Sequence, residues 1–279
     1  MGKVHALNKG LAECSGDFVL FTDADVHFKP GTLCKALSYC LERRLDHLAG
    51  FPDLWPTNFV LDSMIFVFIR HFLMFVSRPW SACKPQSRAF LGIGAFNLVR
   101  RSAFEATEGF EWLRREVTDD MGLGLLMKRS GARCGSVAAF GNVGLHWYRS
   151  IAEAGVGAEK AYATLSNFSL GRTLAIALLT LAMEISPVVL LVPLFFDKVR
   201  FVGYAGIVVL AGFVFSIVMV TRWGRARILP NLAGPLTVWL MAVQFIRAGL
   251  LGWWRGGIAW RGTLYSADEF REGKRVHFP

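Results

Sequence analysis

The chain has 279 residues, of which 53% are apolar, and it carries a formal net charge of +10. This length is enough for one domain with a full core and an appendage. A basic charge beside long apolar runs indicates a membrane surface rather than nucleic acid as the partner. The cysteines are odd in number and include no Cys-x-x-Cys pair, which argues against a disulfide framework and a zinc site. They are Cys14, Cys34, Cys40, Cys83 and Cys134.

The first elements predict an α/β domain. Residues 1–13 are expected to form a helix, and a strand follows over 18–22. A second helix is expected from about Pro30, because proline suits the first helical turn. Since an α/β domain seldom begins on a helix that leads into an interior strand, we expect an N-terminal part upstream of this chain. The apolar stripes of the two helices are Val4, Leu7 and Leu11, and Leu33, Leu37 and Leu41.

The apolar segment 59–76 is about long enough to cross a bilayer, but it carries Asp62, Arg70 and His71. It lies between two acidic clusters, near residues 23 and 119, which we expect to share one site. A single crossing would separate these clusters. We therefore predict an interfacial helix here.

Residues 90–131 return to a soluble pattern of glycine-rich turn, short strand and helix. Three apolar stretches follow, over 173–196, 201–221 and 232–251, each near the length that crosses the hydrocarbon core. We therefore predict an integral membrane protein. Its expected parts are an α/β domain over 1–165, transmembrane helices over 170–252 and a basic tail over 253–279.

Two membrane topologies are compatible with the sequence. The loop after the second stretch and the C-terminal tail are both basic, and the positive-inside rule would place both in the cytoplasm. Three single crossings cannot achieve this. Either Glu184 and Pro187 split the first stretch into a hairpin, or one stretch does not span. The basic residues are Arg222, Arg225 and Arg227 in the loop, and Arg255, Arg261, Arg271, Lys274 and Arg275 in the tail.

Two aspartates, Asp23 and Asp25, follow the predicted strand directly. Successive strand residues point to opposite faces, so these two share one face. Mg²⁺ and Mn²⁺ bind one or two carboxylates and complete their shell with water and phosphate oxygens. The pair therefore suits a metal that holds a diphosphate, although aspartates after a strand are also common in turns.

Lys3 lies at the start of the first predicted helix, where the helix dipole and free N–H groups favour an anion. From Gly2 to Asp25 the sequence has the form G-K-x-x-A-L-N-x-G-(x)5-G-D-(x)5-D-A-D. This run resembles the core of inverting family 2 glycosyltransferases, which have a GT-A fold and use a nucleotide-activated sugar. Further ordered matches are FLGIGAFNLVRRSAFEATEGF from Phe90 and VTDDMGLGLLMKRSG from Val117. The segment GGIAWRGTLY from Gly256 is similar to the end of membrane-bound members that glycosylate lipids.

The resemblance implies an incomplete GT-A domain, which is Rossmann-like and binds a nucleotide sugar, followed by the transmembrane helical region. It implies that Asp23 and Asp25 bind Mg²⁺ or Mn²⁺ and that Asp120 is the catalytic base. The positions that it places near the nucleotide sugar are Lys3, Asn8, Asp23 and Arg149. Those that it places at the sugar and acceptor are Gly92, Gly94, Ala95 and Asp119.

The chemistry of these residue types agrees with the implied roles. An acceptor hydroxyl is a poor nucleophile near neutral pH, and a carboxylate such as Asp120 can take its proton. A metal ion can stabilise the charge of the leaving nucleoside diphosphate. The pair Asp119-Asp120 also suits the first turn of a helix, where acidic side chains favour the dipole, and both roles are compatible.

Two features depart from the family pattern. Many members have Gln/Arg-x-x-Arg-Trp near the membrane boundary, whereas this chain has GLHWYRS. There Arg149 contacts the diphosphate or is an interfacial side chain, and His146 is expected to be structural. The first strand and turn that bind the base in family members are also missing, so the sequence does not define the base.

We expect a UDP-sugar donor and a membrane lipid acceptor, with the catalytic part on the cytoplasmic side of a bacterial inner membrane. One alternative is a catalytically inactive or partner-dependent membrane remnant of such an enzyme. Another is a phosphatase of the haloacid-dehalogenase type, in which Asp23 would be the nucleophile and Asp25 the general acid.

Overall fold

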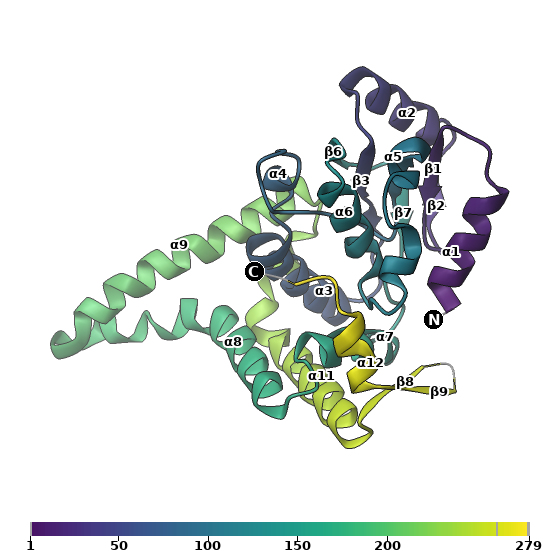
Figure 1. Ribbon diagram of the computed structural model, residues 1–279. Helices are drawn as coiled ribbons and strands as arrows, with labels where there is room; N and C mark the ends of the chain where they lie inside the picture. The colour runs from purple at the N-terminus through teal and green to yellow at the C-terminus, as the bar shows by residue number, and fades with distance from the viewer. Residues whose placement is uncertain (1, 261, 278–279) are drawn as a thin grey trace. The chain divides into compact units, whose positions relative to one another are not determined.

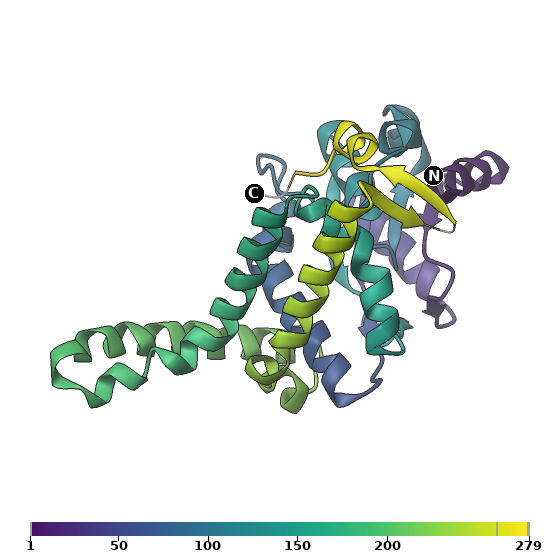
Figure 2. The same cartoon turned by 90° about the horizontal axis from the view of Figure 1, so that it is seen from below.

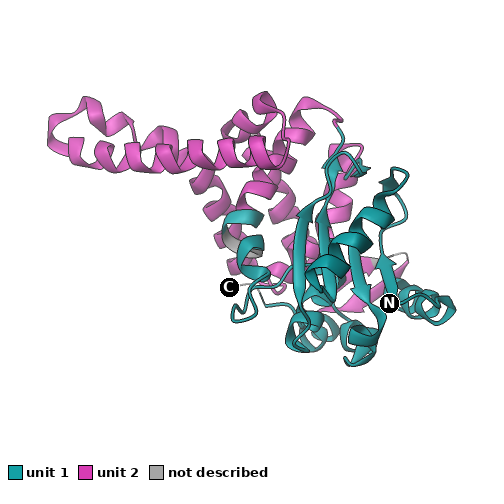
Figure 3. Ribbon diagram, turned by 90° about the horizontal axis from the view of Figure 1, so that it is seen from above, with its two compact units in different colours: residues 1–55, 72–147, 268–279 teal, residues 56–71, 148–267 magenta. Residues whose placement is uncertain are grey.

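The computed structural model describes residues 2–260 and 262–277 (Figure 1). The chain divides into two compact units (Figure 3). The first comprises residues 1–55, 72–147 and 268–279, and the second comprises residues 56–71 and 148–267. The first unit combines strands and helices, and the second is mainly helical.

A four-stranded sheet in the order β1-β5-β3-β6 forms the centre of the first unit. Its strands are β1 (Phe18–Phe21), β5 (Asn97–Arg100), β3 (His47–Phe51) and β6 (Cys134–Ala138). Strand β5 is antiparallel to β1 and β3, whereas β3 and β6 are parallel. The predicted strand over 18–22 is therefore present, and its C-terminal end leads into Asp23.

The alternation of β1 divides the core between the two faces of the sheet. Val19 and Phe21 pack in one cluster with Val4 of α1 (Gly2–Glu13). Leu7 and Leu11 pack against the same cluster, which confirms the predicted stripe of the first helix. On the other face, a second cluster includes Cys40 of α2 (Thr32–Arg43), with Phe18 and Leu20 packed against it.

The predicted stripe of the second helix is confirmed only for Leu37, which packs against the same cluster as Cys40. Leu33 is 47% exposed and Leu41 is 60% exposed, while Thr32 and Cys40 are buried. The hydroxyl of Thr32 donates hydrogen bonds to the carbonyl oxygens of Lys29 at 2.7 Å and Asn142 at 3.2 Å. These bonds turn the face that contains Thr32 and Cys40 toward the sheet, a preference that leucine spacing does not reveal.

Short elements complete the first unit. A second sheet has the order β2-β7-β4, with β2 (His27–Phe28), β7 (Val143–Leu145) and β4 (Asp53–Leu54). Helix α6 (Asp119–Arg129) packs Leu123, Leu126 and Met127 into the same cluster as Val4. The other elements are the π-helix η1 (Phe72–Ser77), α4 (Pro79–Ala82), α5 (Arg101–Glu105), the 3-10 helix η2 (Gly109–Leu113) and most of α12 (Ala267–Gly273).

The second unit is built around an apolar core that includes Met64, Val67, Ala177, Val238 and Phe245. Its helices are α3 (Phe59–His71), α7 (Ile151–Leu165), α8 (Leu170–Val189), α9 (Arg200–Trp223), α10 (Ile228–Leu232) and α11 (Gly234–Trp254). The 3-10 helices η3 (Val192–Phe195) and η4 (Asp197–Val199) join α8 to α9, and β8 (Gly257–Trp260) pairs with β9 (Thr263–Ser266). Helix α3 contributes to this core, and its position at a membrane surface stays a prediction.

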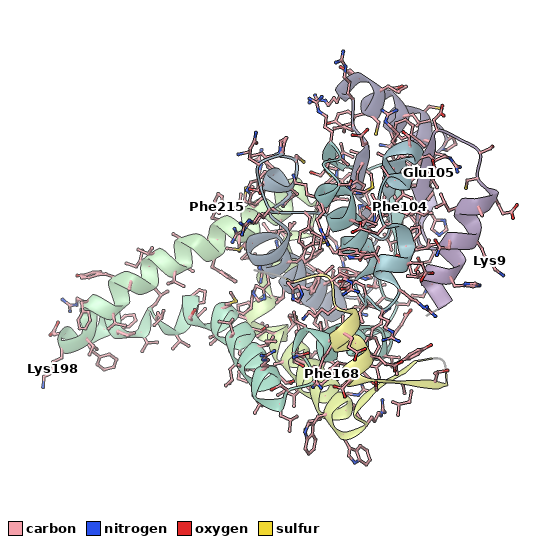
Figure 4. The ribbon with its side chains drawn as sticks, in the orientation of Figure 1. Lys9, Phe104, Glu105, Phe168, Lys198 and Phe215 are labelled. Carbon is pink, nitrogen blue, oxygen red and sulfur yellow. The ribbon has the colours of Figure 1, made fainter. Side chains whose placement is uncertain are left out.

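Within the described residues, three helical segments are long and apolar enough to cross a membrane: Leu170–Phe195, Asp197–Trp223 and Gly234–Trp254. They coincide with the three predicted apolar stretches. Helix α8 continues through Glu184 and Pro187 instead of breaking there. In Figure 2, α8 and α11 run side by side while α9 runs across them. Lys198 lies at the end of the hairpin that η3, η4 and α9 form (Figure 4).

Charged side chains are paired inside the second unit. Arg70 and Glu184 are each 1% exposed at the side chain and form an ion pair. Arg70 also donates to the backbone carbonyl of Asn231 at 2.6 Å, and His71 lies 3.1 Å from Glu184. Asp62 is paired with Arg227. The polar residues of segment 59–76 are thus compensated within the helical core.

Candidate active site

The backbone of Gly94 joins two of the predicted site residues, Asp23 and Asp120. The N–H of Asp23, just after β1, donates to the carbonyl oxygen of Gly94 at 2.9 Å. The N–H of Gly94 donates to Oδ2 of Asp120, in the first turn of α6, also at 2.9 Å. The strand end and the helix start are therefore connected through one residue of the turn that precedes β5.

Neighbouring atoms approach this turn closely, and at Gly92 the backbone of Asp120 leaves no space for a side chain. A Cβ atom on Gly94 would lie 2.4 Å from Oδ2 of Asp23 and 3.4 Å from Oδ2 of Asp120. A Cβ atom on Gly92 would lie 1.7 Å from the carbonyl oxygen of Asp120. The small residues of this turn thus let it approach both carboxylates closely.

Lys3 adds a positive charge to the carboxylates. Its Nζ lies 3.0 Å from Oδ1 of Asp23 and 2.9 Å from Oδ2 of Asp119. The side chain of Asp119 is 11% exposed, whereas those of Lys3 and Asp23 are 45% and 42% exposed. Helix α1, the end of β1 and the start of α6 therefore meet at this cluster, which we call the Lys3 cluster: Lys3, Asp23, Gly94, Asp119 and Asp120.

The electrostatics of the cluster follow from burial and charge. Burial lowers the pKa of Lys3, but the carboxylates of Asp119, Asp23 and Asp120 outweigh it and raise this pKa above its ordinary value. Burial, with the charge of Asp119, raises the pKa of Asp120 to about 6 against the opposing effect of Lys3. Asp120 is therefore mostly ionised at pH 7, with a pKa near the working range of a general base.

The carboxylates of Asp23 and Asp25 fit a hard cation only if water or a bound substrate supplies further oxygen ligands. Asp23 and Asp25 supply carboxylate oxygens, which Mg²⁺ and Mn²⁺ prefer, and Asp25 is exposed. Among the described residues, no group of three or more histidine, cysteine, aspartate or glutamate side chains is arranged to hold a metal ion. Water and phosphate oxygens would have to complete the shell, as they do at many Mg²⁺ sites.

The other predicted site residues do not belong to the Lys3 cluster. Ala95 is buried, and its carbonyl oxygen accepts a hydrogen bond from the hydroxyl of Thr22 at 2.9 Å. Asn8 is half-buried on α1. Arg149 belongs to the second unit, where its N–H donates to Glu153 at 2.7 Å. His146 is exposed, and its ring packs edge-on against that of Trp55.

Sequence reasoning missed the residues that hold the glycine turn in place. Oδ1 of Asn97 accepts the N–H of Ile93 at 3.3 Å and lies 3.0 Å from Nε2 of the buried His47. Thr22, which bonds the other side of this turn, was missed as well. The available signal was Asn97 itself, a polar residue directly before the apolar pair Leu98 and Val99.

The fold defines an α/β protein whose carboxylates gather at a strand end and a helix start, and whose C-terminal half contains three helices able to span a membrane. The family described as "Glycosyl transferase family 2" matches residues 1–108, which include Lys3, Asp23 and Gly94. This part of the chain is therefore similar to family 2 glycosyltransferases, as the resemblance implied. The pair Asp119-Asp120 lies beyond the matched residues. No curated protein matches the chain.

Proposed function

We propose that this chain transfers a sugar from a nucleotide-diphosphate sugar to an acceptor hydroxyl, with Asp120 as the general base. The observation that carries the proposal is the turn at Gly94, whose two backbone groups bond to Asp23 and Asp120. Asp23, proposed for the donor diphosphate, and Asp120, proposed for the acceptor hydroxyl, are therefore adjacent. The family match supports sugar transfer over the phosphatase alternative.

The proposed role of Asp120 follows from its protonation. General-base catalysis contributes typically 10²–10⁴-fold and works best when the pKa of the base lies near the working pH. Burial raises the pKa of Asp120 to about 6. One of its oxygens accepts the N–H of Gly94 and the other accepts the N–H of Met121 at 2.8 Å, so the carboxylate is held in one orientation.

We further propose that Asp23 and Asp25 hold Mg²⁺ or Mn²⁺ together with the donor diphosphate. The bound ion would supply positive charge that stabilises the leaving diphosphate. The ammonium of Lys3, which lies beside Asp23 and Asp119, is proposed to add positive charge for the donor diphosphate. Asp119 keeps Lys3 at the cluster, and Gly92, Gly94 and Ala95 are proposed to line the sugar and acceptor.

We propose a UDP-sugar, a membrane lipid and a catalytic part on the cytoplasmic side of a bacterial inner membrane, with Asn8 and Arg149 toward the donor. The three apolar helices support a membrane-associated acceptor. The basic loop and tail favour the cytoplasmic side for the residues beside them.

The test is a transfer assay with the full chain in lipid vesicles that contain lipids of its host, Mg²⁺ and radiolabelled UDP-sugars. We expect label in the organic extract. Asp120→Asn should lower kcat by about a hundredfold or more. The matched control is Asp17→Asn, an exposed aspartate at the start of β1, which should leave the rate unchanged.

Two other results would each have a definite meaning. No transfer by the wild-type chain with metal and lipid supplied would favour the inactive or partner-dependent alternative. Transfer that Asp120→Asn leaves unchanged would contradict the assignment of the base while keeping the reaction.

A further inference from the structure

The last segment of the chain docks into the first unit. Residues 268–279 are assigned to that unit, although the helical unit precedes them directly. Val276 is 1% exposed and belongs to an apolar cluster with Ala49, Leu91 and Met121. Leu91 and Met121 are the immediate neighbours of Gly92 and Asp120. The C-terminal segment therefore packs against residues next to the Lys3 cluster.

Glu116 connects this segment to the start of α6. The residue is 8% exposed. Its Oε2 accepts the backbone N–H groups of Arg275 at 2.7 Å and Val276 at 2.9 Å. Its Oε1 accepts the N–H of Thr118 at 3.0 Å and the hydroxyl of Thr118 at 2.9 Å. One buried carboxylate thus bonds to the C-terminal segment on one side and to the residue before Asp119 on the other.

Neighbouring contacts hold the segment over the same stretch of chain. Arg115 lies 3.2 Å from Glu272 in an exposed ion pair. A Cβ atom on Gly273 would lie 2.1 Å from Cβ of Arg115, so only glycine permits the observed approach. The guanidinium of Arg275 lies over the ring of Trp112 and donates to the carbonyl oxygen of Trp112 at 3.3 Å.

We propose that Glu116 is a positioning residue, through which the docked segment 268–277 holds the first turn of α6 and therefore Asp119 and Asp120 in place beside Gly94. Hydrogen bonds to an ionised acceptor are stronger than those between neutral groups, and small displacements of reacting groups can lower rates by large factors. The catalytic consequence rests on the proposed function, because Asp120 is the proposed base. The coupling between the segment and α6 does not.

The coupling is tested first by amide hydrogen exchange of the full chain. The variants are Glu116→Gln, which keeps one carbonyl oxygen where the carboxylate has two, and Val276→Asp, which disfavours docking of the segment. We expect faster exchange in both 274–277 and 118–122 for each variant. The matched control is Glu105→Gln, an exposed glutamate on α5, which should leave both regions unchanged. Faster exchange in only one of the two regions would overturn the coupling.

The catalytic part is tested by separating kcat from KM. Glu116→Gln should lower kcat by on the order of tenfold with the KM for the donor nearly unchanged. It should also move the acid limb of the pH–rate profile to lower pH, because a displaced Asp120 loses part of the burial that raises its pKa. An unchanged kcat and pH profile, despite faster exchange, would overturn the positioning role. An inactive wild-type chain would contradict the proposed function, and the exchange result would still decide the coupling.

Discussion

Gly94 and Asp120 are joined by a hydrogen bond of 2.9 Å from the glycine N–H to Oδ2 of the carboxylate. The carbonyl oxygen of the same glycine accepts the N–H of Asp23. Any change in the position of this backbone therefore acts at once on the carboxylate of Asp120 and on the main chain at Asp23. This arrangement makes the turn a sensitive place to test the proposed site.

Gly94→Ala should abolish most transfer activity. Its Cβ would lie 2.4 Å from Oδ2 of Asp23, so the turn or the carboxylate must move. We expect a loss of kcat on the order of a hundredfold. The control is Gly212→Ala in α9, where the new methyl group would meet no described atom within 4 Å. Equal kcat values for the two variants would show that the turn tolerates displacement.

Lys3→Ala should shift the acid limb of the kcat/KM profile to higher pH. Burial and Asp119 raise the pKa of Asp120 to about 6, and the charge of Lys3 opposes them. Removing that charge raises the pKa of Asp120 further, and a base must be deprotonated to act. Activity that falls below about pH 6 in the wild-type chain should then fall at a higher pH. Lys9→Ala, an exposed lysine on the same helix, should leave the limb in place.

The stability of the chain should decrease as the pH falls below 6.5 because of His47. Burial lowers the pKa of His47 to about 4, although its bond with Asn97 opposes this. Between pH 6.5 and 4 the unfolded chain binds a proton that the folded chain excludes, so the free energy of unfolding falls by about 3 kcal/mol across this window. His47→Gln should flatten this dependence in thermal unfolding, whereas His5→Gln should retain it. A wild-type slope in His47→Gln would assign the effect to other groups.

Breaking the ion pair between Arg70 and Glu184 should destabilise the second unit strongly. Both side chains are 1% exposed, so Arg70→Met leaves a buried carboxylate without its main partner. We expect a loss of about 3–5 kcal/mol, and the double variant with Glu184→Gln should recover part of it. Asp197→Asn, which breaks an exposed pair with Arg200, should cost less than about 1 kcal/mol. Thermal unfolding in detergent measures all three.

Helix α9 should cross the membrane. Between Phe201 and Thr221 it has no charged residue, and at about 1.5 Å per residue its 24 residues exceed the thickness of the hydrocarbon core. Cysteines introduced at Lys198 and Arg222 should therefore be labelled from opposite sides by a membrane-impermeant maleimide. The labelling of the five native cysteines in the wild-type chain is the baseline. Labelling of both positions from one side would instead mean that α9 does not cross the bilayer.

The sequence alone determined the elements with local periodicity. The apolar stripe of α1, the strand before Asp23 and the three long apolar helices were predicted because alternation and helical spacing are properties of neighbouring residues. The family resemblance likewise depended on short ordered runs, and the match over residues 1–108 confirmed it. The burial of Thr32 on α2, where Leu33 was expected, escaped prediction because Thr32 bonds to Asn142, a residue far away in the chain.

Only the tertiary structure decided how the predicted site residues meet. It brought the strand end at Asp23, the turn at Gly94 and the helix start at Asp120 together, and it set Lys3 between two carboxylates. It also showed that Glu116 bonds to the C-terminal segment. These contacts join segments that lie far apart in the sequence. They form when the apolar clusters pack, because polar groups in the interior then need hydrogen-bond partners. Their geometry depends on the whole core, which the local sequence pattern does not specify.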